Sequence, residues 1–201
     1  MRMAQDSSKK DFWETRYRDH ITPWDAGKVP AALRDYVAKF TAGARVLIPG
    51  CGFAHEAAFL ADKGFDVLAI DFSPAAIATA LKSLPESARF VQLADFFEFD
   101  VAKRFDIIYE RAFLCALPRT LWDRYAKRSA ELLKPDGIIA GYFFFAESPK
   151  GPPFGTSRAE LQALLGQRFA LVDDQPVTDS IDVFSGKERW MVWRKAEDRT
   201  A

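Results

Sequence analysis

Two glycines and an aspartate in the first half of the chain have the spacing of a site for a ligand that contains adenosine. Gly50 and Gly52 lie in a tight turn after a short apolar run, so the backbone there can approach a ligand with no side chain in the way. Asp71 ends the next apolar run, and a carboxylate at that point can accept two hydrogen bonds from a ribose diol. The helix expected behind the turn offers free backbone N–H groups. We therefore predict an adenosine-containing cofactor.

Two such cofactors, a dinucleotide and S-adenosylmethionine, compete for this site. The dinucleotide fingerprint GxGxxG has a third glycine that lets the helix pack closely on the strand, and this chain has His55 there. Asp95, with Phe96 beside it, follows the third predicted strand and suits an adenine, whose amine is a donor and whose ring lies against apolar surface. The residues favour S-adenosylmethionine. An NAD-linked oxidoreductase and a cofactor-binding module without catalysis are the alternatives.

Composition and charge restrict the partners of the protein. Lys plus Arg and Asp plus Glu number 28 each, so the protein has no broad electrostatic field to attract nucleic acid or a membrane. A small-molecule substrate is expected instead. The two cysteines cannot form a disulfide framework, and the two histidines are too few for a zinc site, so we expect no metal. The chain has no signal-like start and no run of the ~18 apolar residues that a membrane span needs. These features predict a cytoplasmic protein, which we expect to be a monomer.

Alternating strand and helix patterns predict an α/β fold with a mainly parallel seven-stranded sheet, an antiparallel last strand and helices on both faces. Strands are expected at residues 45–48, 65–70, 89–93, 105–109, 138–145, 169–175 and 189–194. Helices are expected at residues 8–20, 31–40, 54–63, 74–83, 118–133 and 157–165, with a turn at residues 134–137. The length predicts one domain, residues 1–201, with a helical N-terminal segment (1–42) ahead of the core (43–196).

Three aromatic residues ahead of the first strand, Trp13, Tyr17 and Trp24, have two interpretations. They can cover an edge of the sheet, as core aromatics do. Alternatively, they close over a ligand held at the Gly50 turn, so that the N-terminal segment caps the cofactor. In an open α/β sheet the ligand lies outside the C-terminal ends of the strands, and Arg111 falls at that edge after the fourth strand.

The chain as a whole resembles class I S-adenosylmethionine-dependent methyltransferases, which have a Rossmann-like fold, in the motifs VLIPGCG, LAIDFS, LADFFEF, FDIIYERAFLCALP and ELLKPDGIIAGYFF. It resembles more narrowly the thiopurine S-methyltransferase superfamily, and especially its thiol and halide methyltransferase branch, in FWETRYRDHITPWDAGKVP and GPPF. The resemblance implies that Gly50 faces the methionine tail, Asp71 the ribose and Asp95 the adenine. The full cofactor site that we expect is Trp13, Tyr17, Trp24, Gly50, Cys51, Gly52, Asp71, Phe72, Ser73, Asp95, Phe96 and Arg111.

The resemblance also implies methyl transfer by in-line displacement to a small soft nucleophile, which is a thiol or thiolate, an aromatic thiol or a halide ion. Such an anion attacks a cationic sulfonium, so an apolar aromatic pocket that removes water suits the reaction. We expect this pocket to form from Trp24, Phe154 and the strand end at residues 143–145, with Arg111 attracting the anion. Thiopurine-type relatives carry arginine at the position of Arg111, whereas halide-type relatives can carry tyrosine.

Several polar residues near the predicted site also have a purely structural interpretation. Arg111 can form an ion pair with Glu110 or Asp95. We expect His55 to serve helix packing at the turn, with contact to the acceptor as the alternative. Cys115 lies in an apolar stretch and is expected to be a core thiol.

Overall fold

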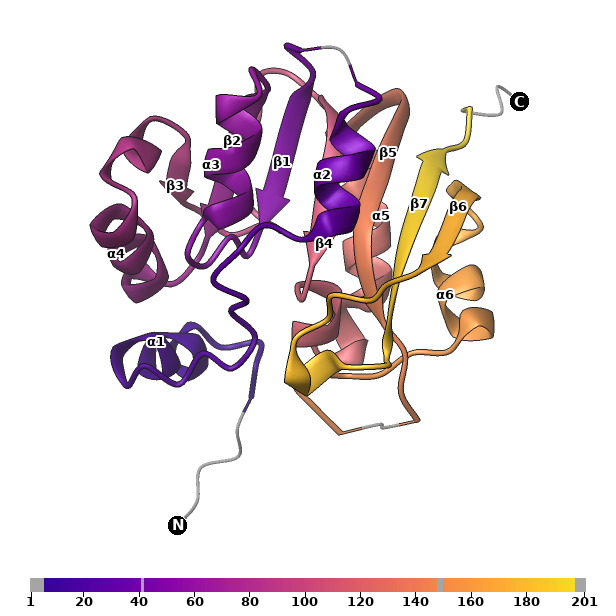
Figure 1. The fold of residues 1–201 in the computed structure, drawn as a ribbon. Helices are drawn as coiled ribbons and strands as arrows, with labels where there is room; N and C mark the ends of the chain where they lie inside the picture. Colours follow the sequence, from indigo (N-terminus) through magenta and orange to yellow (C-terminus); the bar gives the residue numbers. More distant parts are fainter. Residues whose placement is uncertain (1–5, 41, 148–149, 198–201) are drawn as a thin grey trace.

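The computed structural model describes residues 6–40, 42–147 and 150–197. Seven strands form one sheet in the order β3-β2-β1-β4-β5-β7-β6. Strands β1 to β5 pair in parallel, and β7 lies antiparallel between β5 and β6 (Figure 1). The predicted fold class, with its antiparallel last strand, is confirmed.

The strands are β1 (Arg45–Pro49), β2 (Asp66–Asp71), β3 (Val91–Leu93), β4 (Phe105–Arg111), β5 (Leu133–Phe144), β6 (Phe169–Pro176) and β7 (Glu188–Lys195). The α-helices are α1 (Lys10–Arg18), α2 (Ala31–Val37), α3 (His55–Asp62), α4 (Pro74–Ser83), α5 (Trp122–Leu132) and α6 (Arg158–Leu165). Short 3₁₀ helices are η1 (Pro85–Arg89), η2 (Leu114–Ala116), η3 (Arg119–Leu121) and η4 (Asp182–Phe184). No helix in the described part of the chain is both long enough and apolar enough to span a bilayer.

Helices cover both faces of the sheet, because successive side chains of each strand point to opposite sides. On β1, Val46 and Ile48 belong to the apolar cluster that includes Leu33 of α2 and Leu60 of α3. Leu47 between them belongs to a second cluster, which includes Tyr125 of α5. Figure 1 shows α2 and α3 on one side of the sheet and α5 and α6 on the other. The core therefore has two layers, as expected for a sheet buried on both faces.

Local sequence signals set several helix ends as predicted. The Ser73 hydroxyl caps α4 by accepting a hydrogen bond from the Ala76 backbone N–H, and Pro74 occupies the first helical position. Gly64 follows the end of α3 with a φ of 84°, a backbone conformation that favours glycine. Ser157 and Glu160 form a reciprocal capping box at the start of α6.

Other boundaries differ from the prediction. Strand β3 begins at Val91, because residues 85–89 form η1 instead of extended chain. The α-helix after Pro118 begins only at Trp122, since η3 comes first. The turn expected at residues 134–137 lies inside β5, which already pairs with β4 through Leu133, and the irregularity is absorbed by Asp136 with a φ of 60°.

The first helix lies outside the core layers, next to the C-terminal ends of the parallel strands. Figure 1 shows α1 near the ends of β1 and β2 and close to α4. Its Phe12 and Tyr17 side chains are buried. This placement puts α1 at the edge where ligands bind in open α/β sheets.

Candidate functional site

A cavity of about 600 Å³ opens at the C-terminal ends of the strands. That volume is within the range of about 300–1,000 Å³ typical of small-molecule sites. The residues of the predicted site that line it are Trp13, Tyr17, Trp24, Gly50, Cys51, Gly52, Asp71, Phe72, Asp95, Phe96 and Arg111. The structure thus brings together predicted site residues from the N-terminal segment and from the strand ends.

The glycine turn after β1 needs glycine at two positions for conformation and for space. Gly50 and Gly52 have φ values of 61° and 50°, in the left-handed region that favours glycine. A Cβ on Gly50 would lie 2.7 Å from the Phe113 ring, and one on Gly52 would lie 2.7 Å from the Tyr17 hydroxyl. The turn is held from behind, because the Cys51 N–H donates to the Ile70 carbonyl at 3.0 Å. The backbone is therefore bare on the cavity side.

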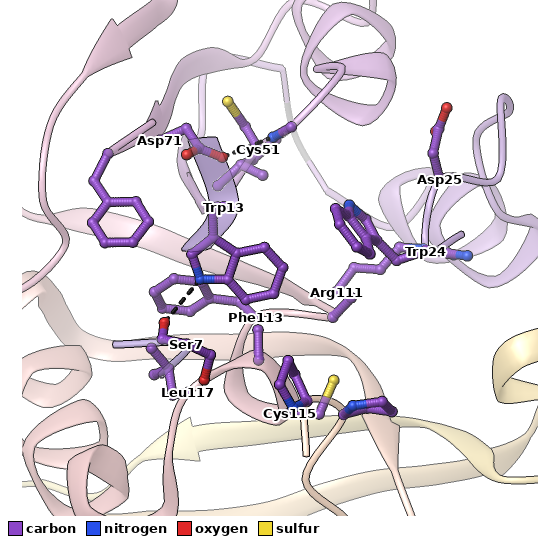
Figure 2. Close-up of a pocket in the computed structure, with 18 of the residues that line it drawn as sticks. Ser7, Trp13, Trp24, Asp25, Cys51, Asp71, Arg111, Phe113, Cys115 and Leu117 are labelled. Carbon is purple, nitrogen blue, oxygen red and sulfur yellow. Dashed lines mark hydrogen bonds between the residues drawn. The ribbon is translucent and has the colours of Figure 1, made fainter. Parts of the chain in front are cut away.

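Asp71 lies at the end of β2, beside the glycine turn. Its Oδ2 accepts from the Gly52 N–H at 3.3 Å, and its Oδ1 accepts from the Ser73 N–H at 2.9 Å. Burial raises the pKa of Asp71 to about 6, although these backbone donors act in the opposite direction. The carboxylate is 6% exposed and is oriented toward the cavity by two backbone groups (Figure 2). It is placed to accept hydrogen bonds from a ligand.

The aromatic side chains of the N-terminal segment contact one another above the site. The Trp13 and Trp24 rings meet edge to face with centroids 5.3 Å apart, and Tyr17 meets Trp24 at 5.9 Å. Trp13 Nε1 donates to the Ser7 carbonyl at 2.8 Å, which fixes the plane of the indole (Figure 2). Because Trp13, Tyr17 and Trp24 all line the cavity with the Gly50 turn, they close over it instead of covering a sheet edge. The second interpretation of these residues is the one that the geometry supports.

A buried carboxylate, which the sequence did not point to, anchors α1 to the core. Glu14 Oε2 accepts from the Ser73 hydroxyl at 2.7 Å and from the Ala75 N–H at 2.9 Å, at the N-terminus of α4. Its other oxygen, Oε1, pairs with Arg18 at 2.6 Å. Burial acts to raise the pKa of Glu14, but the hydrogen bonds from Ala75, Ser73 and Arg18 hold it below its ordinary value. The ionised carboxylate also complements the positive end of the α4 dipole.

Arg111 ends β4 on the opposite side of the cavity from Asp71. Its side chain is 8% exposed, and its Nε lies 3.7 Å from Glu56 Oε1. The guanidinium lies over the Tyr142 ring at 4.9 Å. Its two terminal nitrogens, Nη1 and Nη2, are buried and have no partner at good hydrogen-bond geometry within the described residues, although the buried Tyr109 hydroxyl lies close enough to interact with the guanidinium. Burial alone would lower the pKa of Arg111, but Tyr109, Glu56 and Glu188 raise it, so the group stays cationic.

The ion pairs considered for Arg111 from the sequence are wrong, since both candidate acids bind backbone groups. Glu110 Oε1 accepts from the N–H groups of Phe113 and Leu114 at 3.0 and 2.9 Å, and its Oε2 accepts from the Tyr125 hydroxyl at 2.9 Å. Asp95 Oδ1 accepts from the Phe97 N–H at 2.8 Å. Glu110 thereby fixes the loop after β4, and burial raises its pKa to about 7.

Asp25 and His55 form a second charged pair on the cavity wall. The Asp25 Oδ1 and His55 Nε2 atoms are 3.4 Å apart, and both side chains are about a quarter exposed, at 24% and 26%. His55 is the first residue of α3, so its side chain leaves the helix toward the cavity that it lines. The pair joins the N-terminal segment to the core. Helix packing, the expected role of His55, does not account for this position on the cavity wall, and contact with the acceptor stays a prediction.

Two residues of the predicted site do not line the cavity. Phe154 packs in the core cluster that includes Leu114 and Phe143, and its ring lies against Gly151. Its N–H donates to the Cys115 carbonyl at 2.7 Å, so it supports the cavity wall from outside. Ser73 is fully buried as the cap of α4. The strand end at residues 143–145 is likewise absent from the cavity lining.

Other lining residues were not predicted as part of the site. Phe113 lies in the loop after β4, beneath Gly50, and Val183 and Phe184 come from η4. Cys115 lines the same region, packed with Phe184 as the predicted core thiol, and burial raises its pKa well above the ordinary value. The polar stretch around η4 has no strand or helix periodicity, so no local signal marks its two apolar side chains. Among the described residues, no group of three or more His, Cys, Asp or Glu side chains is arranged to hold a metal ion.

Comparison with known proteins identifies the family. The sequence pattern of the thiopurine S-methyltransferase family matches residues 8–198. The chain belongs to the thiopurine S-methyltransferase family. An NAD-linked oxidoreductase is thereby set aside, and the protein is a methyltransferase whose methyl donor is S-adenosyl-L-methionine.

Curated relatives in this family include two plant proteins. A thiocyanate methyltransferase from Arabidopsis thaliana is 30% identical over 194 residues, which cover 91% of this chain and 84% of the relative. A probable thiol methyltransferase from the same plant is 29% identical over 204 residues, covering 96% and 88% of the two chains. Among solved structures, a Burkholderia thailandensis 1,6-didemethyltoxoflavin-N1-methyltransferase with bound S-adenosylhomocysteine superposes with a TM-score of 0.74. It is 22% identical and covers 94% of this chain and 87% of its own, so the likeness supports the fold.

The residues of this thiopurine S-methyltransferase family member fit S-adenosylmethionine. The bare backbone at Gly50 and Gly52 leaves room for a ligand chain beside β1. The Asp71 carboxylate supplies an acceptor for a diol, and the aromatic rings from α1 supply apolar cover. This combination of bare backbone, carboxylate and aromatic rings suits a nucleoside with an amino-acid tail.

Proposed function

We propose that this protein transfers the methyl group of S-adenosyl-L-methionine to a small, soft, anionic nucleophile: a thiolate, an aromatic thiolate, or thiocyanate or a halide ion. The observation that carries this acceptor class is Arg111. Its guanidinium is buried in the cavity wall, and its two terminal nitrogens have no partner at good hydrogen-bond geometry within the described residues. A buried cation with free donors is a site for an anion, because unmade hydrogen bonds of a buried charged group are costly.

The cofactor half of the site is assigned to the glycine turn and the neighbouring strand ends. The turn at Gly50 would hold the methionine tail, and Asp71 would accept hydrogen bonds from the ribose. Asp95 would accept from the adenine amine, with Phe96 as an apolar neighbour. The support for these roles is that all four residues line one cavity. Residues 1–42 would act as a cap through Trp13, Tyr17 and Trp24.

The chain's own residues contribute alignment, removal of water and charge. S-adenosyl-L-methionine, when bound, supplies an electrophilic methyl group on a sulfonium. The aromatic cap excludes water from the nucleophile, which is otherwise stabilised by hydration. Holding the nucleophile in line can supply several kcal/mol of the barrier, about 7 at the lower end of measured proximity effects. Arg111 favours the thiolate over the thiol by Coulomb attraction.

The names of the relatives agree with an anionic sulfur acceptor. Thiocyanate and thiols are the acceptors named for the two plant proteins. Both offer a polarisable sulfur that carries negative charge, or gains it on losing a proton. Arg111 in this chain provides the counter-charge that either acceptor needs.

Replacing Arg111 tests the proposal. Arg111→Gln should lower kcat/KM for thiocyanate by roughly 10- to 100-fold, because a hydrogen bond to a charged group contributes about 1.5–3 kcal/mol. The thiol pH profile should move to higher pH, since the thiolate loses its counter-ion. The single substitution would leave Glu56 as an unpaired buried acid. The double variant Arg111→Gln/Glu56→Gln, which removes both charges, is therefore measured beside it. The assay is S-adenosylhomocysteine formation, beside calorimetric affinity for S-adenosylhomocysteine.

Arg124 provides a matched control. It lines the same cavity but is exposed and lies over the Phe97 ring at 4.6 Å. Arg124→Gln should change kcat/KM for thiocyanate by less than about threefold, as expected for exposed charges. An unchanged thiol pH profile in Arg111→Gln would sink the assigned role. Retained cofactor binding without methylation of thiols, thiocyanate or iodide by the unaltered protein would contradict the proposed function itself.

A further inference from the structure

Asp25 and His55 face each other on the cavity wall, and each is held by a second contact. Asp25 Oδ1 faces His55 Nε2 at 3.4 Å and also accepts from the Gly27 N–H at 3.0 Å. The Phe53 ring stacks on the imidazole with centroids 5.8 Å apart and an interplanar angle of 3°. The carboxylate is thus fixed by a backbone group, and the imidazole plane is fixed by an aromatic ring. A carboxylate on the Nε2 side of the ring favours the tautomer that carries its proton on Nε2.

The second ring nitrogen of His55 is Nδ1. With Nε2 turned toward a carboxylate, neutral His55 carries its proton on Nε2 and leaves a lone pair on Nδ1. Within the described residues, Nδ1 of His55 accepts no hydrogen bond. His55 lines the cavity with Arg111, and the two are linked through Glu56, which follows His55 in sequence and lies 3.7 Å from Arg111. A proton acceptor and a cation for the resulting anion are therefore on one wall.

Three charged groups surround His55. Asp25 faces it from the N-terminal segment, Glu56 from α3, and Arg111 reaches the same cluster from the end of β4. The nearby Asp25 carboxylate raises the pKa of His55, with burial acting in the opposite direction and Glu56 adding to the increase. A raised pKa makes the neutral imidazole a stronger proton acceptor.

We propose that His55, oriented by Asp25, is the base that accepts the proton of a thiol acceptor in this cavity. The role rests on the proposed function and divides its acceptors into two classes. As the S–H bond breaks, the proton goes to His55 Nδ1 and the thiolate remains beside Arg111. The thiolate then bonds to the methyl carbon while the donor's S–CH₃ bond breaks, its electron pair passing to the donor sulfur, and His55 releases the proton to solvent. Thiocyanate and iodide carry no proton and need no base.

Comparing acceptors that carry a proton with acceptors that carry none tests the role of His55. His55→Gln keeps a side-chain donor that can reach Asp25 but lacks a basic nitrogen. At neutral pH this variant should lose about a hundredfold in kcat/KM for an alkyl thiol, since a positioned base contributes typically about 100- to 10,000-fold. It should change kcat/KM for thiocyanate by less than about threefold. Asp25→Asn should show the same dependence on acceptor with a smaller loss.

A binding measurement separates the base from a structural support. The apparent pKa of benzenethiol bound to the protein in the presence of S-adenosylhomocysteine is read from its thiolate absorbance. It should rise in His55→Gln, because the proton has lost its acceptor. His20→Asn is the matched control, since His20 is the other histidine of the chain, is exposed and lies outside the cavity lining. It should leave both readouts unchanged.

Three outcomes decide the matter. Equal losses for the thiol and for thiocyanate, with weaker S-adenosylhomocysteine binding, would mean that the pair only ties the N-terminal segment to α3 and would overturn the role. An unchanged pKa of bound benzenethiol in His55→Gln would also overturn it. An unaltered protein that binds S-adenosylhomocysteine but methylates neither class would overturn the proposed function, and this role with it.

Discussion

Removing the Glu14 carboxylate should release the N-terminal helix from the cofactor site. Glu14 Oε2 holds the Ser73 hydroxyl and the Ala75 N–H, at 2.7 and 2.9 Å, and these groups begin α4 directly after Asp71 and Phe72. Hydrogen bonds to a charged group contribute about 1.5–3 kcal/mol, and a carboxylate at a helix N-terminus contributes about 0.3–1 kcal/mol. Since both bonds share one oxygen, we assign about 3 kcal/mol to their joint loss in Glu14→Ala.

That loss should be visible as weaker ligand binding. About 3 kcal/mol corresponds to roughly a hundredfold change in the equilibrium between docked and undocked α1. Trp13 and Tyr17 lie on this helix and line the cavity, so a ligand that needs the docked helix binds less tightly when docking is incomplete. The buried packing of Phe12 and Tyr17 retains part of the docking free energy. We therefore expect Kd for S-adenosylhomocysteine to rise at least about tenfold.

The measurement is calorimetric titration of S-adenosylhomocysteine, together with hydrogen exchange of the α1 amides. Arg18→Ala is the control, because it removes the other partner of the same carboxylate. The Arg18 side chain is 68% exposed, and exposed ion pairs contribute about 0–1 kcal/mol, so Kd should change by less than about threefold. Glu14→Gln keeps an acceptor oxygen and should fall between the two. Wild-type affinity and wild-type exchange of α1 in Glu14→Ala, with the core folded by circular dichroism, would refute the reasoning.

Two further predictions concern buried carboxylates. Burial raises the pKa of Asp71 to about 6, and only the ionised group can accept from both ribose hydroxyls, so S-adenosylhomocysteine should bind less tightly as the pH falls through about 6. Calorimetry should find this pH dependence absent in Asp71→Asn, and a Kd independent of pH in the unaltered protein would argue against the assigned role. Burial raises the pKa of Glu110 from 4.5 to about 7, so between these values the native state keeps a proton that the unfolded chain has released, and stability falls as the pH rises. The melting temperature of Glu110→Gln, relative to that of the wild type, should therefore increase as the pH rises from 4.5 to about 7. A difference in melting temperature that does not change with pH would contradict the raised pKa of Glu110.

Much of the cavity wall around the glycine turn was predictable from the sequence, because its signals are local. A glycine pair after an apolar run and an aspartate at the end of the next run depend only on backbone sterics and on the two-residue period of a strand. Gly50 and Gly52 have the left-handed φ values that such a turn needs, and Asp71 lies beside them. The cap of α4 at Ser73 followed from the same kind of signal, although the side chain points into the core instead of the cavity.

The rest of the cavity wall was less predictable, because it depends on segments that are distant in sequence. Phe154 was expected in the pocket on the evidence of its aromatic type, but its ring packs in the core beside Gly151. Val183 and Phe184 occupy the cavity wall from a stretch that has no periodicity. An aromatic side chain gains a similar free energy from burial in a core or in a pocket wall, so its type alone does not decide between them.

The sequence by itself determined the succession of strands and helices along the chain, the bare glycine turn and the acid next to it. Each of these features follows from the conformational preferences of neighbouring residues. Only the tertiary structure decided which charged groups meet. Glu14 lies 59 residues before Ser73, Asp25 meets His55, and Arg111 faces Glu56 instead of Glu110. Pairing of charges across such separations is set by how the N-terminal segment packs over the strand ends, and no spacing along the chain records it. The anchored N-terminal helix and the charged wall of the cavity are therefore properties of the folded protein.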